Sequence, residues 1–272
     1  MKSPPWQQYQ QIDAVNWSTL REFRESPLKY RYRLDNVRED TASLAVGRAV
    51  HTAVFEPQRL LLDYTVYQGR RAGKAWDAFR EAHHEQTILT EEQWDRCHGI
   101  QAAVRAHPLC EPYLHTGAAE QVLQWTDAET RLRCKGRLDW ISTGRAVVDL
   151  KTTRSIQLHM LQNTVARYGY HTQIAFYLDG HEATRRERLQ GVIIAVESQP
   201  PYDVGVFVVS DEAIYAGQEE YRSLLTRLKW CRESGQWPGR YTEEQTLDLP
   251  AWMFDDEEDP TSLGITIGGE AA

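Results

Sequence analysis

The chain has 272 residues, 41% of them hydrophobic, so it is long enough for one large domain or two small ones with a packed core. A formal net charge of −8 argues weakly against a nucleic-acid-binding protein, and no apolar run approaches the roughly 18 residues that span a bilayer. The four cysteines are widely spaced and form no C-x-x-C pair, which excludes zinc-ribbon and redox motifs. Scattered thiols without a recognisable signal peptide predict a cytoplasmic protein with no membrane partner.

The N-terminal part of the chain is predicted to be mainly helical. Residues 1–16 are polar and are expected to lie loosely on the surface, and a helix follows them with Ser18 as its N-cap. Apolar residues at helical spacing predict a second helix over residues 41–55, which Pro57 ends. His51 lies on the small-residue face of that helix. A histidine there is more often a hydrogen-bonded core residue than a ligand, although neutral imidazole suits Mn²⁺ and is tolerated beside Mg²⁺.

The rest of the chain alternates strands with helices. Residues 58–115 combine a short strand with polar helices and carry no readable chemistry. The predicted strands are Tyr64–Tyr67, Glu120–Thr126, Arg131–Ser142, Arg145–Lys151, Leu189–Glu197 and Val204–Ser210; the predicted helices lie around Trp76–His84 and over Glu91–Ala106, 156–166, Tyr170–Gly180 and 212–234, the last capped by Asp211. This order predicts a mixed α/β domain with a central sheet flanked by helices.

The C-terminal segment differs in composition from the body. Residues 241–272 hold nine acidic residues and no lysine or arginine, and without them 31 basic residues face 30 acidic ones, a balance of +1. A near-neutral body allows a local basic groove. We interpret residues 1–238 as a single domain with a helical N-terminal part, and residues 239–272 as an acidic, flexible, solubilising tail.

Two consecutive predicted strands each end near a carboxylate, Asp139 on the first and Asp149 on the second. Asp149 and Lys151 point to the same side because strand side chains repeat every two residues. Two carboxylates and an ammonium group can hold Mg²⁺ or Mn²⁺ beside a water, with the Leu150 carbonyl as a further ligand, and this arrangement suits phosphodiester cleavage. Lys151 would stabilise the developing charge or help to remove a proton. Considered alone, the stretch fits an amphipathic hairpin with solvated charges equally well.

Three more residues are candidates for the same site. Glu120 begins the preceding strand, where it would complete the carboxylate cluster or be one of many surface glutamates. Gln173 and Tyr177 lie four residues apart on a helix and therefore share a face. They could position the water or Lys151 and bond a phosphate, but spacing alone favours a core tyrosine and a capping glutamine.

Together these residues resemble the PD-(D/E)XK nuclease superfamily, in particular its RecB/RecE-like branch, from about Ser18 to Tyr177. The matching pieces, in chain order, are Ser18-x-Leu20-x-x-Phe23-x-x-Ser26-Pro27-x-x-Tyr30, Gly47-x-x-x-His51, Glu120, Gly136-Arg137-Leu138-Asp139, Asp149-Leu150-Lys151-Thr152 and Gln173-x-x-x-Tyr177. Each piece alone is weak, but six in this order indicate one topology. Within the branch the chain is most similar to the RecE-type exonucleases, the exodeoxyribonuclease VIII group of phages and prophages.

The resemblance implies a restriction-endonuclease-like core and a Mg²⁺-dependent exodeoxyribonuclease, with Mn²⁺ as an alternative metal. Such an enzyme resects linear double-stranded DNA from its 5′ ends, leaving 3′ single-stranded tails for recombination by strand annealing. It also implies a homo-oligomeric ring, a tetramer, and a single-strand-annealing recombinase as partner. By the same carry-over, the metal ligands are His51, Asp139, Asp149 and the Leu150 carbonyl, Glu120 supports the metal or its water, Lys151 assists the nucleophile, and Gln173 and Tyr177 organise the site.

Two features of the sequence differ from other members of this branch and narrow the expected type of nuclease. Iron–sulfur members of the branch have cysteine where Ser26 stands, and Cys231 is the only cysteine after the core, so no iron–sulfur cluster is expected. The chain also lacks the G-x-x-x-x-G-K-[ST] motif of a helicase motor. Two alternatives stay open: a structure-specific DNA endonuclease on the same core, and a catalytically inactive relative that binds DNA or protein. The role of the acidic tail is also open. It is either solubilising, or it competes with DNA for a basic groove, or it binds a partner protein.

Overall fold

The structure is a computed structural model that describes residues 6–36 and 41–250. Its centre is a five-stranded mixed sheet in the order β3-β4-β5-β6-β7, in which β5 and β6 are parallel and the other neighbours are antiparallel. The strands are β3 (Gly117–Thr126), β4 (Arg133–Ser142), β5 (Ala146–Thr153), β6 (Gln190–Glu197) and β7 (Val204–Val208). The parallel pair is joined by a helical crossover, α9 (Leu158–Tyr168) and α10 (Tyr170–Arg185). The predicted mixed α/β fold is confirmed.

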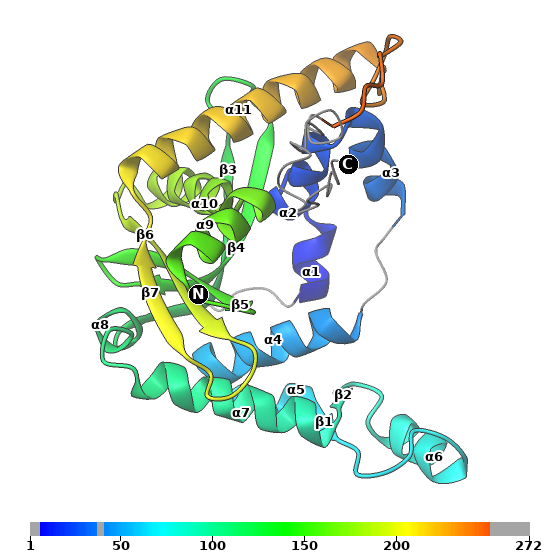
Figure 1. Cartoon of the computed structure of the whole chain (residues 1–272), viewed down its shortest axis with the longest axis vertical. Coiled ribbons are helices and arrows are strands. Elements are labelled where there is room, and N and C mark those ends of the chain that lie inside the picture. Colours follow the sequence, from blue (N-terminus) through cyan, green and yellow to red (C-terminus); the bar gives the residue numbers. More distant parts are fainter. Residues whose placement is uncertain (1–5, 37–40, 251–272) are drawn as a thin grey trace, which may run out of the picture.

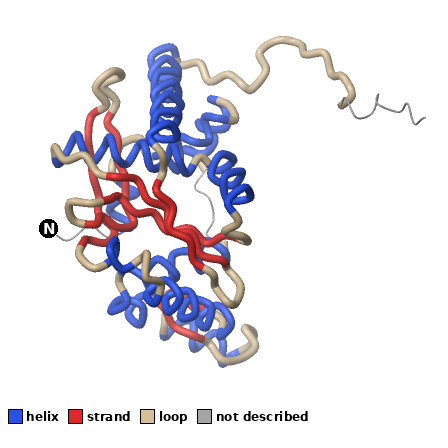
Figure 2. Tube along the Cα trace, turned by 60° about the vertical axis from the view of Figure 1, so that its left-hand side comes forward, coloured by secondary structure: helices blue, strands red, loops and turns tan. Residues whose placement is uncertain are grey.

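Helices cover both faces of the sheet (Figures 1 and 2). On β5, Val147 packs into a core with α10 and α11 (Asp211–Ser234), whereas Val148 and Leu150 pack into a second core with α4 (Ala42–Phe55) and α7 (Glu91–Ala106). Neighbouring residues on β5 therefore enter different cores, as the two-residue period of a strand requires. A strand that is buried on both faces reads as a continuous apolar run, which is how β6 appears in the sequence.

Strands β4 and β5 separate at one defined point. Their ladder joins Ser142 to Ala146, Ile141 to Val147 and Trp140 to Val148, and it ends there. In the same register the next pair would be Asp139 and Asp149. The two strands thus part at the two aspartates, and beyond this point the Asp139 side chain, instead of the β4 backbone, accepts the N–H of Leu150 on β5.

The remaining elements surround this core. The shorter ones are α1 (Trp6–Gln11), α2 (Trp17–Leu20), the 3₁₀ helix η1 (Arg21–Arg24), α3 (Pro27–Asp35), α5 (Pro57–Asp63), β1 (Tyr64–Val66), α6 (Lys74–Ala82), β2 (Thr87–Leu89) and α8 (Glu111–Leu114). Strands β1 and β2 form a small parallel pair, and α6, which buries none of its residues, projects from the body beside them (Figure 1). None of the described helices is both long and apolar enough to cross a membrane.

The prediction of a loose N-terminal surface segment is wrong for residues 6–16, and residues 1–5 lie outside the described residues. Residues 6–11 form α1, Tyr9 and Val15 are buried, and Val15 makes a parallel bridge with Cys134 on β4. The backbone N–H of Val15 donates to Arg133 O at 2.8 Å, and its carbonyl accepts from the N–H of Lys135 at 2.7 Å. The segment takes the edge of β4 that β5 leaves open when the strands part, and period counting along residues 1–16 does not reveal such a distant partner.

Two local expectations about helix caps are also corrected, and a third, about Pro57, is extended. The N-cap of α2 is Asn16 and not Ser18, because the Asn16 side chain accepts from the N–H of Thr19 at 3.0 Å. Ser210, and not Asp211, caps α11. Pro57 ends α4 as expected but also occupies the first turn of α5, where its missing N–H costs nothing.

The chain contacts the body on both sides of the predicted boundary, and Arg240 in the predicted tail forms an ion pair with Glu25. Trp237 stacks on Tyr30 with ring centroids 6.1 Å apart, and the Pro238 carbonyl accepts a hydrogen bond from the N–H of Leu28 at 3.0 Å. The acidic block and the C-terminal segment, residues 251–272, lie outside the described residues. The boundary of the domain near residue 238 and the character of the tail therefore stay predictions.

Candidate active site

Three side chains from three elements meet where β4 and β5 part. His51 comes from α4, Glu120 from β3 and Asp139 from β4, and one ligand atom of each lies within 4.8 Å of the others. The sheet register accounts for the two carboxylates: Ala119 pairs with Trp140 and Gln121 with Leu138, so Glu120 stands directly across from Asp139. Opposed residues of neighbouring strands carry their side chains on the same face.

Glu120 has an unusual backbone conformation. Its φ is +51°, in the left-handed region that side chains other than glycine rarely adopt. Such strain is found where the surrounding structure holds a residue in place for function. Its carboxylate forms an ion pair with Arg137 on β4, and burial, reinforced by the nearby Asp139 charge, raises the pKa of Glu120 above its usual value. The arginine offsets part of that shift.

Asp139 is held from two sides. Its Oδ2 lies 3.3 Å from Nδ1 of His51 and accepts the backbone N–H of Leu150 at 3.0 Å. Burial would raise the pKa of Asp139, but His51, Lys151 and the Leu150 amide outweigh it and lower the pKa. Burial would likewise lower the pKa of His51, and the Asp139 carboxylate reverses this and raises it. Asp139 is therefore an ionised carboxylate in contact with the His51 ring.

Asp149 is the carboxylate of the site with the fewest hydrogen-bond partners. It is 1% exposed, and neither of its oxygens accepts a hydrogen bond of ordinary geometry from any described residue. Nζ of Lys151 lies 2.6 Å from Oδ2 as an ion pair. Burial raises the pKa of Asp149 to about 6, against the opposing effect of Lys151. Buried polar atoms normally have hydrogen-bond partners, so these oxygens, which have only the Lys151 ammonium beside them, would accept a metal cation as a further partner.

Lys151 is surrounded by the residues of α10. Its Nζ lies 3.3 Å from Oε1 of Gln173 and 4.7 Å from the centre of the Tyr170 ring. The side-chain amide of Gln173 donates to the hydroxyl of Tyr177 at 3.2 Å, so Gln173 connects the lysine to the tyrosine. Burial lowers the pKa of Lys151, but Asp149 and Asp139 outweigh it, so the pKa is raised and the ammonium stays charged.

The structure brings all the predicted residues into one place, while their individual roles stay predictions. The Leu150 side chain is buried in the core, so only its backbone can take part. The N–H and C=O of a strand residue point to the same edge, and the Leu150 N–H meets Asp139, so its carbonyl also lies on the side facing β4.

Sequence reasoning missed three residues that support the site. Lys135 and Arg137 precede Asp139 by four and two residues on β4, so the two-residue period would have placed all three on one face. Arg137 pairs with Glu120, and its guanidinium lies 5.3 Å from the Trp6 ring of α1. Tyr170, in the first turn of α10, covers Lys151, but nothing in its local pattern marks it.

These residues define what the site can do chemically. His51, Glu120, Asp139 and Asp149, with the Leu150 carbonyl, would hold a divalent metal, which when bound supplies Lewis-acid stabilisation of a phosphate and a more acidic water. Lys151 would supply a fixed positive charge near a phosphate bound to that metal. Gln173 and Tyr170 restrict the lysine to that position, and Tyr177, buried and neutral, anchors Gln173.

Comparison with known proteins agrees with this geometry. The family model described as "PDDEXK-like domain of unknown function (DUF3799)" matches residues 16–248, and the chain belongs to this family. The match covers the whole sheet and every site residue. The predicted resemblance to the PD-(D/E)XK superfamily is therefore confirmed, whereas its RecE-type specificity is not tested by this match.

Solved structures support the same fold. A "putative exonuclease" from Eubacterium rectale is 16% identical to this chain with a TM-score of 0.65, and the alignment covers 94% of this chain and 99% of that one. At this identity the likeness shows the fold alone. A second structure, named SSO0001, is 15% identical over 83% of this chain and 96% of that one, and its TM-score of 0.29 carries no argument. A search of curated proteins finds no match.

Proposed function

We propose that this protein is a divalent-metal-dependent deoxyribonuclease that degrades linear double-stranded DNA from its ends. The observation that carries this proposal is Asp149, a buried carboxylate that accepts no hydrogen bond of ordinary geometry from any described residue and has the Lys151 ammonium beside it, together with the cluster of His51, Glu120 and Asp139. A cation completes the coordination of these oxygens, and a fixed ammonium beside it suits the charge that develops on a phosphate during cleavage.

Action on DNA ends is the finer part of the proposal. It is supported by the resemblance to RecE-type enzymes and by the description of the Eubacterium rectale protein as a putative exonuclease. On the same resemblance we propose 5′-to-3′ resection that leaves 3′ tails for strand annealing, a ring of identical subunits and an annealing recombinase as partner. Mg²⁺ is the proposed ion and Mn²⁺ the substitute, because the ligand set is dominated by carboxylate oxygens with one imidazole.

The test is a cleavage assay on linear duplexes labelled at either the 5′ or the 3′ end, with covalently closed circles in parallel. With Mg²⁺ the protein should release nucleotides from the linear duplex and leave the circles intact. Excess EDTA, or Asp149→Ala in a protein that still folds, should abolish the release. Full activity in excess EDTA or in the Asp149→Ala variant contradicts the proposal. Cleavage of the closed circles identifies an endonuclease instead. No cleavage with either Mg²⁺ or Mn²⁺ identifies a catalytically inactive relative.

A further inference from the structure

A groove of about 430 Å³ lies next to the candidate active site. It shares two elements with that site: α4, which carries His51, and the C-terminal end of β5, which carries Asp149 and Lys151. The residues that line it are Ala42, Ser43, Val46, Gly47 and Val50 of α4, Gln93, Arg96 and Ile100 of α7, Thr152 and Thr153 of β5, and Arg154 and Ser198 in the loops after β5 and β6.

The charge of this groove is opposite to that of the chain. Among the described residues that line it, two are arginines, five carry a hydroxyl or amide side chain, and none is acidic. The chain as a whole has a net charge of −8. A concave, acid-free surface with two guanidinium groups favours an anion, and a phosphodiester backbone is the anion that a neighbouring nuclease site would act on.

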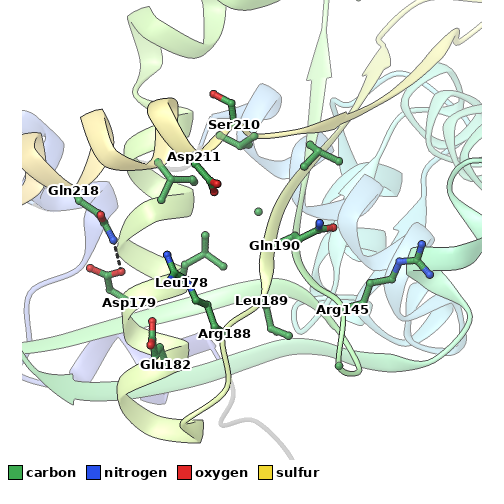
Figure 3. A pocket seen from close by; sticks show the side chains of 15 residues that line it. Arg145, Leu178, Asp179, Glu182, Arg188, Leu189, Gln190, Ser210, Asp211 and Gln218 are labelled. Atoms are coloured by element: carbon green, nitrogen blue, oxygen red, sulfur yellow. Dashed lines mark hydrogen bonds between the residues drawn. The ribbon is translucent and has the colours of Figure 1, made fainter.

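A second hollow shows that this composition is not general. It has a volume of about 710 Å³ and lies at the opposite end of β5, between the β4–β5 turn, α10 and the start of α11 (Figure 3). Arg145 and Arg188 line it, but so do Asp179, Glu182 and Asp211. With more acidic than basic side chains, that hollow does not favour a phosphate.

The two arginines of the groove, Arg154 and Arg96, differ in how readily their guanidinium groups could bind a ligand. Arg154 is exposed and forms no side-chain hydrogen bond or ion pair with any described residue. The hydroxyl of Thr153 donates to Ser155 O at 3.1 Å and accepts the Ser155 N–H at 3.4 Å, which fixes the turn that carries Arg154. Arg96 bonds Glu92 at 2.7 Å, but Glu92 is 82% exposed, and such a surface pair is weak enough to exchange for a phosphate.

Helix α4 leads from the metal ligands into the groove. Gly47 precedes His51 by four residues, so it lies on the same face about 6 Å along the helix axis, and Ser43 lies about 6 Å further. A Cβ built on Gly47 meets no atom within 4 Å, so the space above it is open. A backbone chain can therefore approach the helix closely at this position.

We infer that this groove holds the phosphodiester backbone of the DNA strand next to the scissile phosphate, with Arg154 and Arg96 on successive phosphates and Gly47 leaving room for the strand. The inference rests on the proposed nuclease function. It assigns the path of the substrate strand along α4 and away from the second hollow.

The test compares Arg96→Ala/Arg154→Ala with Arg188→Ala, an exposed arginine of the second hollow. All are made in a Lys151→Met background, so that Mg²⁺ is present while DNA is not consumed. Fluorescence anisotropy with a labelled linear duplex is measured over a range of salt concentrations. The slope of log affinity against log salt should fall by about one unit for each groove arginine, with roughly tenfold weaker binding for each, and should not change for Arg188→Ala. Equal slopes in the groove and control variants overturn the inference.

A steric variant gives independent evidence. Gly47→Leu places a side chain in the open groove while removing a glycine from a helix, so its melting temperature should stay equal or rise. Its cleavage of linear DNA should fall at least tenfold, whereas Gly239→Leu, also in open space, should cleave like the unmodified protein. Unchanged cleavage by a folded Gly47→Leu protein overturns the groove assignment alone. Failure of the unmodified protein to cleave any DNA refutes the proposed function itself.

Discussion

At the scale of single residues, two aspartates of the site have pKa values shifted in opposite directions because their surroundings differ. Asp139 receives an imidazole and a backbone N–H, and its pKa is lowered. Asp149, ten residues along the chain, receives only the Lys151 ammonium, and burial raises its pKa to about 6. The two carboxylates differ because one lies among donors and the other does not. Both carboxylates stay available to a cation, Asp139 within the cluster of His51 and Glu120 and Asp149 beside Lys151.

Asp139→Asn should remove the stabilisation by metal while leaving the fold intact, because an amide oxygen can still accept the Leu150 N–H. A divalent ion at 100 times its Kd stabilises a folded protein by about 2.7 kcal/mol, which raises Tm by roughly 5–10 °C in a chain of this size. Differential scanning fluorimetry with Mg²⁺ or Mn²⁺ measures this shift. Asp95→Asn, an exposed change on α7, is the matched control. A full shift in Asp139→Asn would remove this residue from the ligand set.

Gly136→Ala should disturb the site through packing alone. The added Cβ would lie 3.0 Å from two ring carbons of Tyr177 and 3.1 Å from Cδ1 of Leu138, in a part of the core with little room to move. Overpacking of this kind costs about 1–3 kcal/mol, and displacement of Tyr177 loosens Gln173 and hence Lys151. Urea unfolding and the cleavage rate should both decline. Gly239→Ala, which meets no atom within 4 Å, should change neither.

At the scale of elements, the parting of β4 and β5 both creates the site and requires a partner for the exposed strand edge. Helix α1 and the segment up to Val15 supply that partner. Lys135 holds them: its buried Nζ donates to Tyr9 O at 2.8 Å and to Ile12 O at 2.7 Å. Cations at the C-terminal end of a helix bind the carbonyls that have no partner within the helix. The same face of β4 then continues to Arg137 and Asp139.

Lys135→Met should release α1 from the sheet. The change leaves buried carbonyls without a donor, each of which costs about 1–3 kcal/mol. Amide hydrogen exchange over residues 6–15 should become faster while exchange in α10 stays slow. Lys29→Met, which removes only an exposed ion pair with Glu25 on the surface of α3, is the control. Unchanged exchange at residues 6–15 would show that apolar packing of Tyr9 and Val15 alone holds the segment.

At the scale of the whole molecule, charge is divided between parts that, under the proposed function, would act oppositely on DNA. The groove beside the site is free of acidic side chains among its described lining residues, whereas the segment from residue 251 to the C-terminus carries six acidic residues and no basic one. A net charge of −8 would slow the approach of DNA, so the local distribution of charge decides binding more than the total.

Deleting residues 251–272 changes the net charge from −8 to −2, because six acidic residues leave (−8 + 6 = −2). DNA affinity at low salt should rise, and the gain should vanish as the Debye length falls from about 10 Å at 0.1 M to about 3 Å at 1 M salt. Anisotropy titrations at several salt concentrations measure this. A full-length chain with the six acids changed to amides should behave like the deletion. Equal affinity of all three proteins at low salt would leave the segment a solubilising role.

Local patterns were sufficient for much of the fold and for the central residues. The limits of α7 and the positions of β4, β5, β6 and α11 follow from hydrophobic period, which depends only on near neighbours. The two capping errors have a local cause: Asn16 and Ser210 each lie one or two residues before a plausible rival cap, and only backbone geometry decides between such neighbours.

The sequence by itself determined the class of the site: Asp139, Asp149 and Lys151 on consecutive strands, in an order typical of one nuclease superfamily. Only the tertiary structure decided that the ladder between β4 and β5 stops before the two aspartates and that Glu120 stands across from Asp139. It alone also placed Tyr170 against Lys151 and Arg137 against Glu120. The physical reason is range. Side-chain period is set by adjacent residues, whereas the register of strands, the strained backbone of Glu120 and the acid-free groove arise from contacts between segments far apart in the chain.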